Sequence, residues 1–253
     1  MLPVSPSYLE RRWMRLWRSI AKRTRTTFLY NHKIHGRLLL DSSEPMSLTL
    51  YSGYEYETDE FALIQTHLRT HPTDVFFDIG ANWGGYSLLA ARCGVPQIEA
   101  FEPNRKVFGL LAANITLNRF HNRIRAWNIA AGDTDCETEL HIDPRATEVS
   151  TLAPGAMPEK WQYSDVQRCL VRRIGDLLPI RDKTVFIKVD VEGFERQAIA
   201  GLSSLLETNK VHMMVEVLND QDAFRDFAEA HGLTFVSHFG SNFFFETAGA
   251  ATR

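Results

Sequence analysis

The fold is decided by the stretch Asp78-Ile79-Gly80-Ala81-Asn82-Trp83-Gly84-Gly85, which follows the apolar run 75–77 and leads into Tyr86-Ser87-Leu88-Leu89-Ala90-Ala91. This order predicts a strand, a glycine-rich turn and a helix. A second acid, Glu102, ends the next apolar run, 98–101. A nucleotide-type ligand laid across the carboxyl ends of two adjacent parallel strands would meet a glycine floor and two carboxylates.

The spacing of the glycines discriminates between ligands. Dinucleotide-binding folds place a glycine where the backbone must approach a pyrophosphate closely, and counting from Gly80 that position is Asn82. Asp78 adds negative charge nearby, which suits a cationic ligand. Because S-adenosylmethionine carries a sulfonium, an amino-acid group and a ribose but no phosphate, the loop favours it over NAD.

Apolar runs alternate with helical patterns from residue 75 onward. The pattern predicts strands at 75–79, 97–101, 123–129, 185–189 and 211–217, and helices at 60–69, 85–92, 105–118, 195–206 and 221–231. Such alternation predicts an α/β protein with a mostly parallel, doubly wound, Rossmann-like sheet. Two short runs, 234–237 and 242–245, predict a hairpin that gives the sheet an antiparallel C-terminal edge. A further short strand, Glu139–Ile142, is expected beside the strand at 123–129.

Two segments interrupt this regular pattern. Residues 143–166 contain three prolines and form a connection too long for an ordinary turn, so we interpret them as a substrate lid. Residues 51–57 are aromatic and acidic. They could line a cofactor or substrate mouth, or form a surface segment with partly buried tyrosines.

The charge distribution divides the chain into a basic N-terminal extension, 1–44, and a catalytic domain, 45–253. The net charge is −3, but residues 1–40 carry nine Lys/Arg and one acid, so the remainder carries −11. No apolar run approaches the roughly 18–20 residues needed to span a bilayer. The three cysteines are widely spaced and have no metal-ligand pairing, which is typical of reduced thiols in a cytoplasmic protein.

Residues 8–22 predict a basic amphipathic helix with Trp13, Leu16, Trp17 and Ile20 at helical spacing. Three interpretations stay open: docking on the domain, peripheral contact with an anionic membrane, or a transit peptide. The oligomeric state is not indicated by the sequence.

The motifs as a set resemble those of the FkbM-type S-adenosylmethionine-dependent methyltransferases. The resemblance runs from about Glu57 to about Glu216 and rests on Asp78-Ile79-Gly80-Ala81-Asn82, Phe101-Glu102-Pro103-Asn104, Ala131-Gly132-Asp133 and Lys188-Val189-Asp190-Val191-Glu192-Gly193. It implies a class I methyltransferase fold and a methyl transfer, mostly to hydroxyls of sugars, glycolipids and other natural products. The residues it implies for cofactor binding are Asp78 and Gly80 at the methionine part, Glu102 at the ribose and the Ala130–Asp133 turn at the adenine, with Asn82, Pro103, Asn104 and Asp190 beside them.

The candidate catalytic residues are Asp190, Glu192 and Glu216, because they end the two strands nearest the expected acceptor side. A hydroxyl is a poor nucleophile, and a carboxylate can take its proton. Clustered carboxylates can instead hold Mg²⁺, and the sequence does not separate base catalysis from metal assistance.

Other functional classes stay open beside this one. A Rossmann-like protein could bind S-adenosylmethionine without turnover, and an NAD-dependent oxidoreductase is disfavoured by Asn82. Nucleic acid is not expected as a partner, because the −11 body lacks a basic face for phosphate contacts. The acceptor is therefore expected to be a small molecule or a glycan.

Overall fold

A computed structural model describes residues 26–51 and 57–247. The predicted helix at 8–22 lies outside these residues. Within them, a central sheet of seven strands has the order β11-β12-β10-β9-β3-β4-β5. These strands are β3 (Val75–Ile79), β4 (Gln97–Phe101), β5 (Ile124–Trp127), β9 (Thr184–Val189), β10 (Lys210–Glu216), β11 (Leu233–Phe239) and β12 (Asn242–Thr247).

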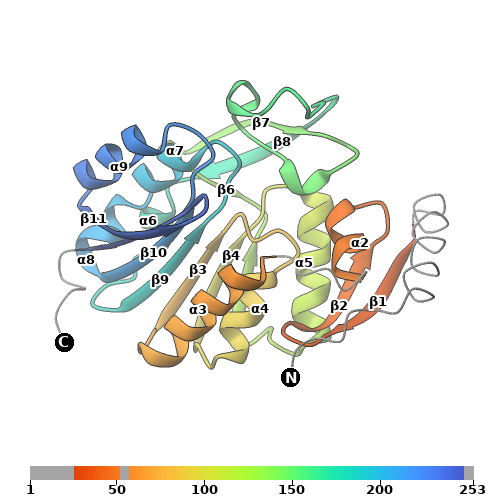
Figure 1. The fold of residues 1–253 in the computed structure, drawn as a ribbon, viewed down its shortest axis with the longest axis horizontal. Helices are drawn as coiled ribbons and strands as arrows, with labels where there is room; N and C mark the ends of the chain where they lie inside the picture. Colours follow the sequence, from red (N-terminus) through yellow and green to blue (C-terminus); the bar gives the residue numbers. More distant parts are fainter. Residues whose placement is uncertain (1–25, 52–56, 248–253) are drawn as a thin grey trace.

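The pairing of the strands confirms the predicted Rossmann-like sheet. Strands β5, β4, β3, β9 and β10 are parallel, and β12 is antiparallel to both β10 and β11. The C-terminal hairpin therefore inserts its second strand next to β10 and leaves β11 at the edge of the sheet (Figure 1).

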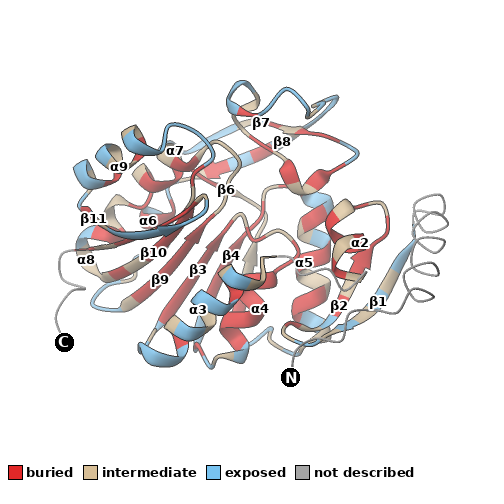
Figure 2. Ribbon diagram, in the orientation of Figure 1, coloured by how far each residue is buried: buried red, intermediate tan, exposed pale blue. Residues whose placement is uncertain are grey.

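Helices cover both faces of this sheet. They are α3 (Thr58–Thr70), α4 (Gly85–Arg92), α5 (Arg105–Leu117), α6 (Ile174–Leu177), α7 (Glu195–Ala200), α8 (Ser203–Thr208) and α9 (Gln221–Ala230), whereas α2 (Pro45–Tyr51) lies beyond α5 (Figure 1). Because side chains alternate along a strand, β3 sends Phe76 into the apolar layer under α3, α4 and α5, and Phe77 into the layer under α6 to α9. The central strands are accordingly buried almost throughout (Figure 2).

The predicted helix at 195–206 is divided in the structure into α7 and α8. The division falls at Gly201, where a Cβ would lie 1.9 Å from the carbonyl oxygen of Gly132. Close packing against another backbone segment thus favours a glycine and a turn at this point, and the helical pattern in the sequence does not show that contact.

A hairpin of β1 (Thr27–His32) and β2 (Gly36–Asp41), which the sequence did not predict, packs beside α5 (Figure 1). The Asn114 side chain of α5 accepts a hydrogen bond from Leu39 N at 2.6 Å, and Asn118 exchanges two with Arg37. Leu38 of β2 is fully buried in the same apolar layer as α4 and α5. Residues 27–41, assigned from sequence to the extension, therefore pack on the body of the domain.

A second, smaller sheet has the order β6-β8-β7 and stands above the central one in Figure 1. Its strands are β6 (Ala130–Ala131), β7 (Cys136–Ile142) and β8 (Asp165–Arg172). The expected pairing of Glu139–Ile142 with the strand at 123–129 is wrong: these residues belong to β7, which pairs with β8. The segment 143–164 connects β7 to β8 and contains two short 3₁₀ turns, η1 (Thr147–Val149) and η2 (Pro154–Ala156). We call it the 143–164 loop.

Candidate active site

A cavity of about 340 Å³ lies at the carboxyl ends of β3, β4, β9 and β10. Open α/β sheets bind their ligands at this edge. Of the residues predicted from sequence, the cavity is lined by Gly80, Asn82, Glu102, Pro103, Ala130, Asp190, Glu192 and Glu216. Asp78, Asn104 and Asp133 do not line it, although the first two hold its walls in place.

The glycine-rich turn after β3 lies very close to the chain segment that follows β9. Gly80 has a φ of +81°, and a Cβ there would lie 1.7 Å from the carbonyl oxygen of Asp190. Asn82 also adopts a positive φ, 52°, and its amide donates to Glu102 Oε2 at 2.9 Å. The turn thereby forms a floor of backbone between the two acidic strand ends.

Glu102, which follows β4, is a buried carboxylate at the edge of the cavity. It is 7% exposed, lines the cavity and accepts amide hydrogen bonds from Asn82 and, at 2.8 Å, from Asn104. Burial raises its pKa to about 7, against the effect of those two amides. An ionised carboxylate has about four acceptor positions, so two remain for a vicinal diol.

Asp78 has a structural position beneath the turn. Its Oδ2 accepts hydrogen bonds from the amide and the hydroxyl of Ser87, at 2.8 and 2.5 Å, and so fixes the first turn of α4. Its Oδ1 is buried without a hydrogen-bond partner among the described residues. Burial raises the pKa of Asp78 to about 6, and the Ser87 hydroxyl and the charge of Lys188 act in the opposite direction.

Asn104 and Asp133, like Asp78, do not line the cavity. Asn104 is the N-cap of α5, where its Oδ1 accepts from Lys106 N and its Nδ2 donates to the hydroxyl of Ser150 at 2.9 Å. Asp133 is exposed in the turn that follows β6. The adjacent wall of the cavity is apolar and includes Ala130 and Leu140, which suits an adenine ring.

Charged side chains gather at the other end of the cavity. Lys188, 2% exposed, forms an ion pair of 3.2 Å with Asp190, and its Nζ lies 5.2 Å from the centre of the Tyr86 ring. Neighbouring Glu216 accepts a hydrogen bond from Ser241 at 2.9 Å. The charge of Asp190, followed by burial, raises the pKa of Glu216, whereas burial is the main cause that raises the pKa of Glu192.

Two groups of site residues were not selected from the sequence. Glu57 was not named singly, but it belongs to the segment 51–57 that was expected either to line a mouth or to lie on the surface; it lines the cavity and accepts a 2.6 Å hydrogen bond from the Tyr86 hydroxyl. Its acidic, aromatic surroundings were the available signal. The 143–164 loop covers the cavity with residues Thr147, Glu148, Val149, Ser150 and Leu152. Its long, proline-rich sequence predicted a lid but not which residues face inward.

No cluster of three or more His, Cys, Asp or Glu side chains with metal-binding geometry occurs in residues 26–51 and 57–247. Within the same residues, no helix combines the length and apolarity needed to cross a membrane.

The cavity has the features that S-adenosylmethionine requires. Its volume falls within the usual range of small-ligand pockets, roughly 300–1,000 Å³. Glu102 offers free acceptor positions beside the floor formed by Gly80, and apolar residues, among them Ala130 and Leu140, also line the cavity. The residues present therefore fit the cofactor.

Comparisons with known proteins identify the family of the chain. Residues 78–241 match the model of the Methyltransferase FkbM domain. The chain is 27% identical over 183 residues to the 31-O-demethyl-FK506 methyltransferase FkbM of Streptomyces tacrolimicus, covering 61% of this chain and 69% of that protein.

Two solved structures are similar over most of their length. A ribosomal protein L11 methylase from Lactobacillus delbrueckii subsp. bulgaricus has a TM-score of 0.45 and 12% identity, covering 76% of this chain and 78% of that one. A precorrin-6y C5,15-methyltransferase from Geobacter metallireducens has a TM-score of 0.43 and 15% identity, covering 74% and 86%.

The family model spans more than half of the chain and includes the strand ends that form the cavity. The protein therefore belongs to the FkbM methyltransferase family and is an S-adenosylmethionine-dependent methyltransferase with a Rossmann-like class I fold.

Proposed function

We propose that this enzyme methylates a hydroxyl group on a sugar, a glycolipid or another polyhydroxylated natural product. The observation that carries the proposal is the group of carboxyls from Asp190, Glu192 and Glu216, which line one end of the cavity beside the buried Lys188. The name of the Streptomyces relative, which specifies a 31-O-demethyl compound, supports transfer to oxygen.

The cavity is the proposed cofactor site. Glu102 would accept hydrogen bonds from the ribose, the Ala130 wall would contact the adenine, and the turn at Gly80 and Asn82 would support the methionine part. When bound, S-adenosylmethionine supplies a methyl group on a positively charged sulfur. The residues around the cavity would hold the acceptor oxygen next to that methyl group, and such positioning supplies much of the rate.

Glu216 is the proposed base. A general base acts best when its pKa lies near the working pH, and Asp190 and burial raise the pKa of Glu216 towards neutrality. Glu216 would accept the proton of the acceptor hydroxyl as its oxygen takes the methyl group that the cofactor supplies. Lys188 balances the negative charge of Asp190, and Glu192 accepts a hydrogen bond from a neighbouring hydroxyl of the acceptor.

Turnover with Glu216→Gln and Asp190→Asn tests these roles. S-adenosylhomocysteine formation is measured against a panel of glycosides and hydroxylated macrolactones, and the methylated atom is identified by NMR. The acid limb of the wild-type pH profile should lie near pH 7, because Glu216 must lose its proton to act. We expect Glu216→Gln to remove turnover without changing the affinity for S-adenosylhomocysteine. Asp190→Asn should move the acid limb to lower pH, since it removes the charge that raises the pKa of Glu216.

The exposed Asp176, whose carboxylate contacts Arg173 and Ser204, provides the control variant Asp176→Asn, which should behave as wild type. Full turnover by Glu216→Gln, or a product methylated on nitrogen or carbon, would contradict the proposal.

Metal assistance is tested by the same assay. Because Lys188 already supplies a positive charge beside Asp190, we propose proton transfer without a metal ion. Turnover should then be the same with EDTA as with added Mg²⁺. Loss of turnover in EDTA that Mg²⁺ restores would instead assign the carboxyls to metal binding.

Two proposals concern the surroundings of the enzyme. The −11 charge outside the basic N-terminus opposes binding of nucleic acid, and the acceptor is proposed to be a small molecule or a glycan. Peripheral membrane contact through residues 8–22 stays a prediction. Flotation with anionic vesicles tests it, and a chain that stays at the bottom of the gradient would contradict it.

A further inference from the structure

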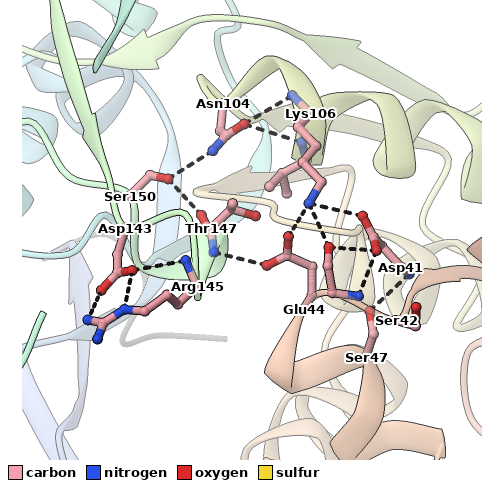
Figure 3. A network of polar contacts seen from close by, with 12 residues as sticks. Asp41, Ser42, Glu44, Ser47, Asn104, Lys106, Asp143, Arg145, Thr147 and Ser150 are labelled. Carbon is pink, nitrogen blue, oxygen red and sulfur yellow. Dashed lines mark hydrogen bonds and ion pairs between the residues drawn. The ribbon is translucent and has the colours of Figure 1, made fainter. Parts of the chain in front are cut away.

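The 143–164 loop forms one wall of the cavity, and its position depends on a network of polar contacts (Figure 3). The backbone amide of Thr147 donates to Glu44 Oε2 at 2.9 Å. Glu44, which lies between β2 and α2, is 4% exposed and also forms a 2.5 Å ion pair with Lys106 of α5. The N-terminal part of the fold thus holds the loop across 103 positions of the sequence.

Lys106 fixes the direction of the Glu44 carboxylate. Its ammonium group also forms a 3.0 Å ion pair with Asp41 and donates to the hydroxyl of Ser43 at 3.0 Å. Asp41 in turn accepts hydrogen bonds from the amide and the hydroxyl of Ser43. Hydrogen bonds between charged groups are stronger than neutral ones, although the half-exposed Lys106 ammonium reduces this gain by keeping contact with water.

Other contacts hold the loop to the remaining walls of the cavity. Ser150 accepts from Asn104 at the start of α5, and the Thr151 hydroxyl donates to the carbonyl oxygen of Glu192 at 2.5 Å. The loop therefore joins the first turn of α5 to the candidate acceptor side. At Thr147 the Glu44 contact connects the loop to the segment between β2 and α2, and the neighbouring Glu148 of the loop also interacts with Glu44 and with the backbone of Met46.

Loss of the Glu44 carboxylate would affect the loop more than the rest of the domain. The Thr147 amide would be buried without a hydrogen-bond partner, which destabilises the closed position of the loop. Lys106 would keep its ion pair with Asp41, and water would replace its contact with Glu44. An open loop would take Thr147, Val149 and Ser150 away from the cavity that they line.

We propose that Glu44 is a positioning residue for cofactor binding: through Thr147 it keeps the 143–164 loop closed over the cavity and slows the escape of the cofactor. The proposal rests on the assignment of this cavity to S-adenosylmethionine, made above. Glu44 itself does not line the cavity.

The test measures equilibrium and dissociation of S-adenosylhomocysteine with the full-length chain, by calorimetry and by displacement in a stopped-flow instrument. Glu44→Ala should weaken binding roughly tenfold, mainly through faster dissociation, and should raise KM for S-adenosylmethionine more than it lowers kcat. Glu44→Gln keeps an oxygen that can accept from the Thr147 amide, so its affinity for S-adenosylhomocysteine should decrease less than that of Glu44→Ala. Glu137→Ala is the matched control, because it removes a carboxylate paired with Arg168 on the exposed surface of the β7–β8 ribbon.

Limited trypsin cleavage provides a second readout, because Arg145 and Lys160 lie within the loop. S-adenosylhomocysteine should protect the wild-type loop and protect the Glu44→Ala loop much less. A merely structural role would lower the melting temperature without this ligand-dependent difference.

The proposal would be overturned if Glu44→Ala matched the wild type in its affinity for S-adenosylhomocysteine, in the rate of dissociation of that ligand and in the protection of the loop from trypsin. If that variant does not fold, Lys106→Ala and Glu44→Gln decide it, and unchanged dissociation in both would overturn it. Glu102→Ala separates this failure from failure of the cavity assignment. If Glu102→Ala binds S-adenosylhomocysteine weakly and the Glu44 and Lys106 variants bind it normally, the role of Glu44 is refuted and the cavity assignment stands. If all variants bind it normally, the cavity assignment is refuted as well.

Discussion

Replacement of Gly80 by alanine should damage both the stability of the domain and its cofactor site, and the structure supplies a closely matched control. Gly80 and Gly232 have the same φ of +81°. A Cβ at Gly80 would lie 1.7 Å from the Asp190 carbonyl oxygen, whereas a Cβ at Gly232 would have no neighbour within 4 Å. The two alanine variants therefore share the backbone cost and differ in the contact.

The magnitudes follow from these two terms. A residue with a side chain in the left-handed region costs roughly 1–2 kcal/mol, which is the whole expected effect of Gly232→Ala. Gly80→Ala adds forced separation of two backbone segments, which a side-chain rotation cannot relieve. Overpacking of this kind costs roughly 1–3 kcal/mol more. In a chain of this size, each kcal/mol corresponds to roughly 2–4 °C in melting temperature.

Urea unfolding and calorimetry with S-adenosylhomocysteine provide the assay. Gly80→Ala should unfold at lower urea than Gly232→Ala and should bind the ligand weakly, because Asp190 moves with its carbonyl group. Gly232→Ala should bind like the wild type. Equal losses of stability in the two variants, with full ligand affinity in Gly80→Ala, would refute the close approach of Gly80 to the Asp190 carbonyl group.

The remaining predictions concern titration. His35 is fully buried, and burial, followed by the charge of His32, lowers its pKa from 6.5 to about 3. The neutral ring is thus favoured in the folded state, so this contribution to stability is complete above pH 6.5 and is lost as the pH falls towards 3; at pH 5 the loss is about 2 kcal/mol. Urea unfolding should show that, between pH 8 and pH 5, the free energy of unfolding falls by about 2 kcal/mol less in His35→Phe than in the wild type. Equal decreases in the two proteins would contradict the assignment. Glu102→Gln should weaken S-adenosylhomocysteine binding on the order of 10–100-fold, since charge-assisted hydrogen bonds are lost. The affinity of the wild type should decrease as the pH falls below 7, where Glu102 gains a proton. Calorimetry should show that Glu102→Gln lacks this decrease.

The central sheet could be predicted because its information is local. The apolar run at 75–79 and the glycines after it indicate a strand and a turn from neighbouring residues alone, and the structure has β3 at those residues. The same holds for β9 and β10, whose ends carry Asp190 and Glu216. Strand ends in a parallel sheet meet at one edge, so their acidic residues were expected to lie together, as they do.

Features that depend on distant contacts could not be predicted. The β7–β8 ribbon pairs residues across the 143–164 loop, and neither strand shows a strong apolar pattern that would predict its partner. The direction of a side chain at a strand end is equally non-local. Asp78 turns to Ser87 beneath the cavity, whereas Glu102 faces the ligand side, although both are acids at the ends of neighbouring strands.

The central claim is that the cavity at the strand ends binds S-adenosylmethionine, with Glu102 at the ribose and the carboxyls of Asp190 and Glu216 at the acceptor side. A crystal structure of the complex with S-adenosylhomocysteine measures this most directly. We predict that the ribose hydroxyls lie about 2.5–2.7 Å from the Glu102 carboxylate, with the sulfur facing Asp190. A ligand bound outside this cavity, or a ribose without contact to Glu102, would contradict the account.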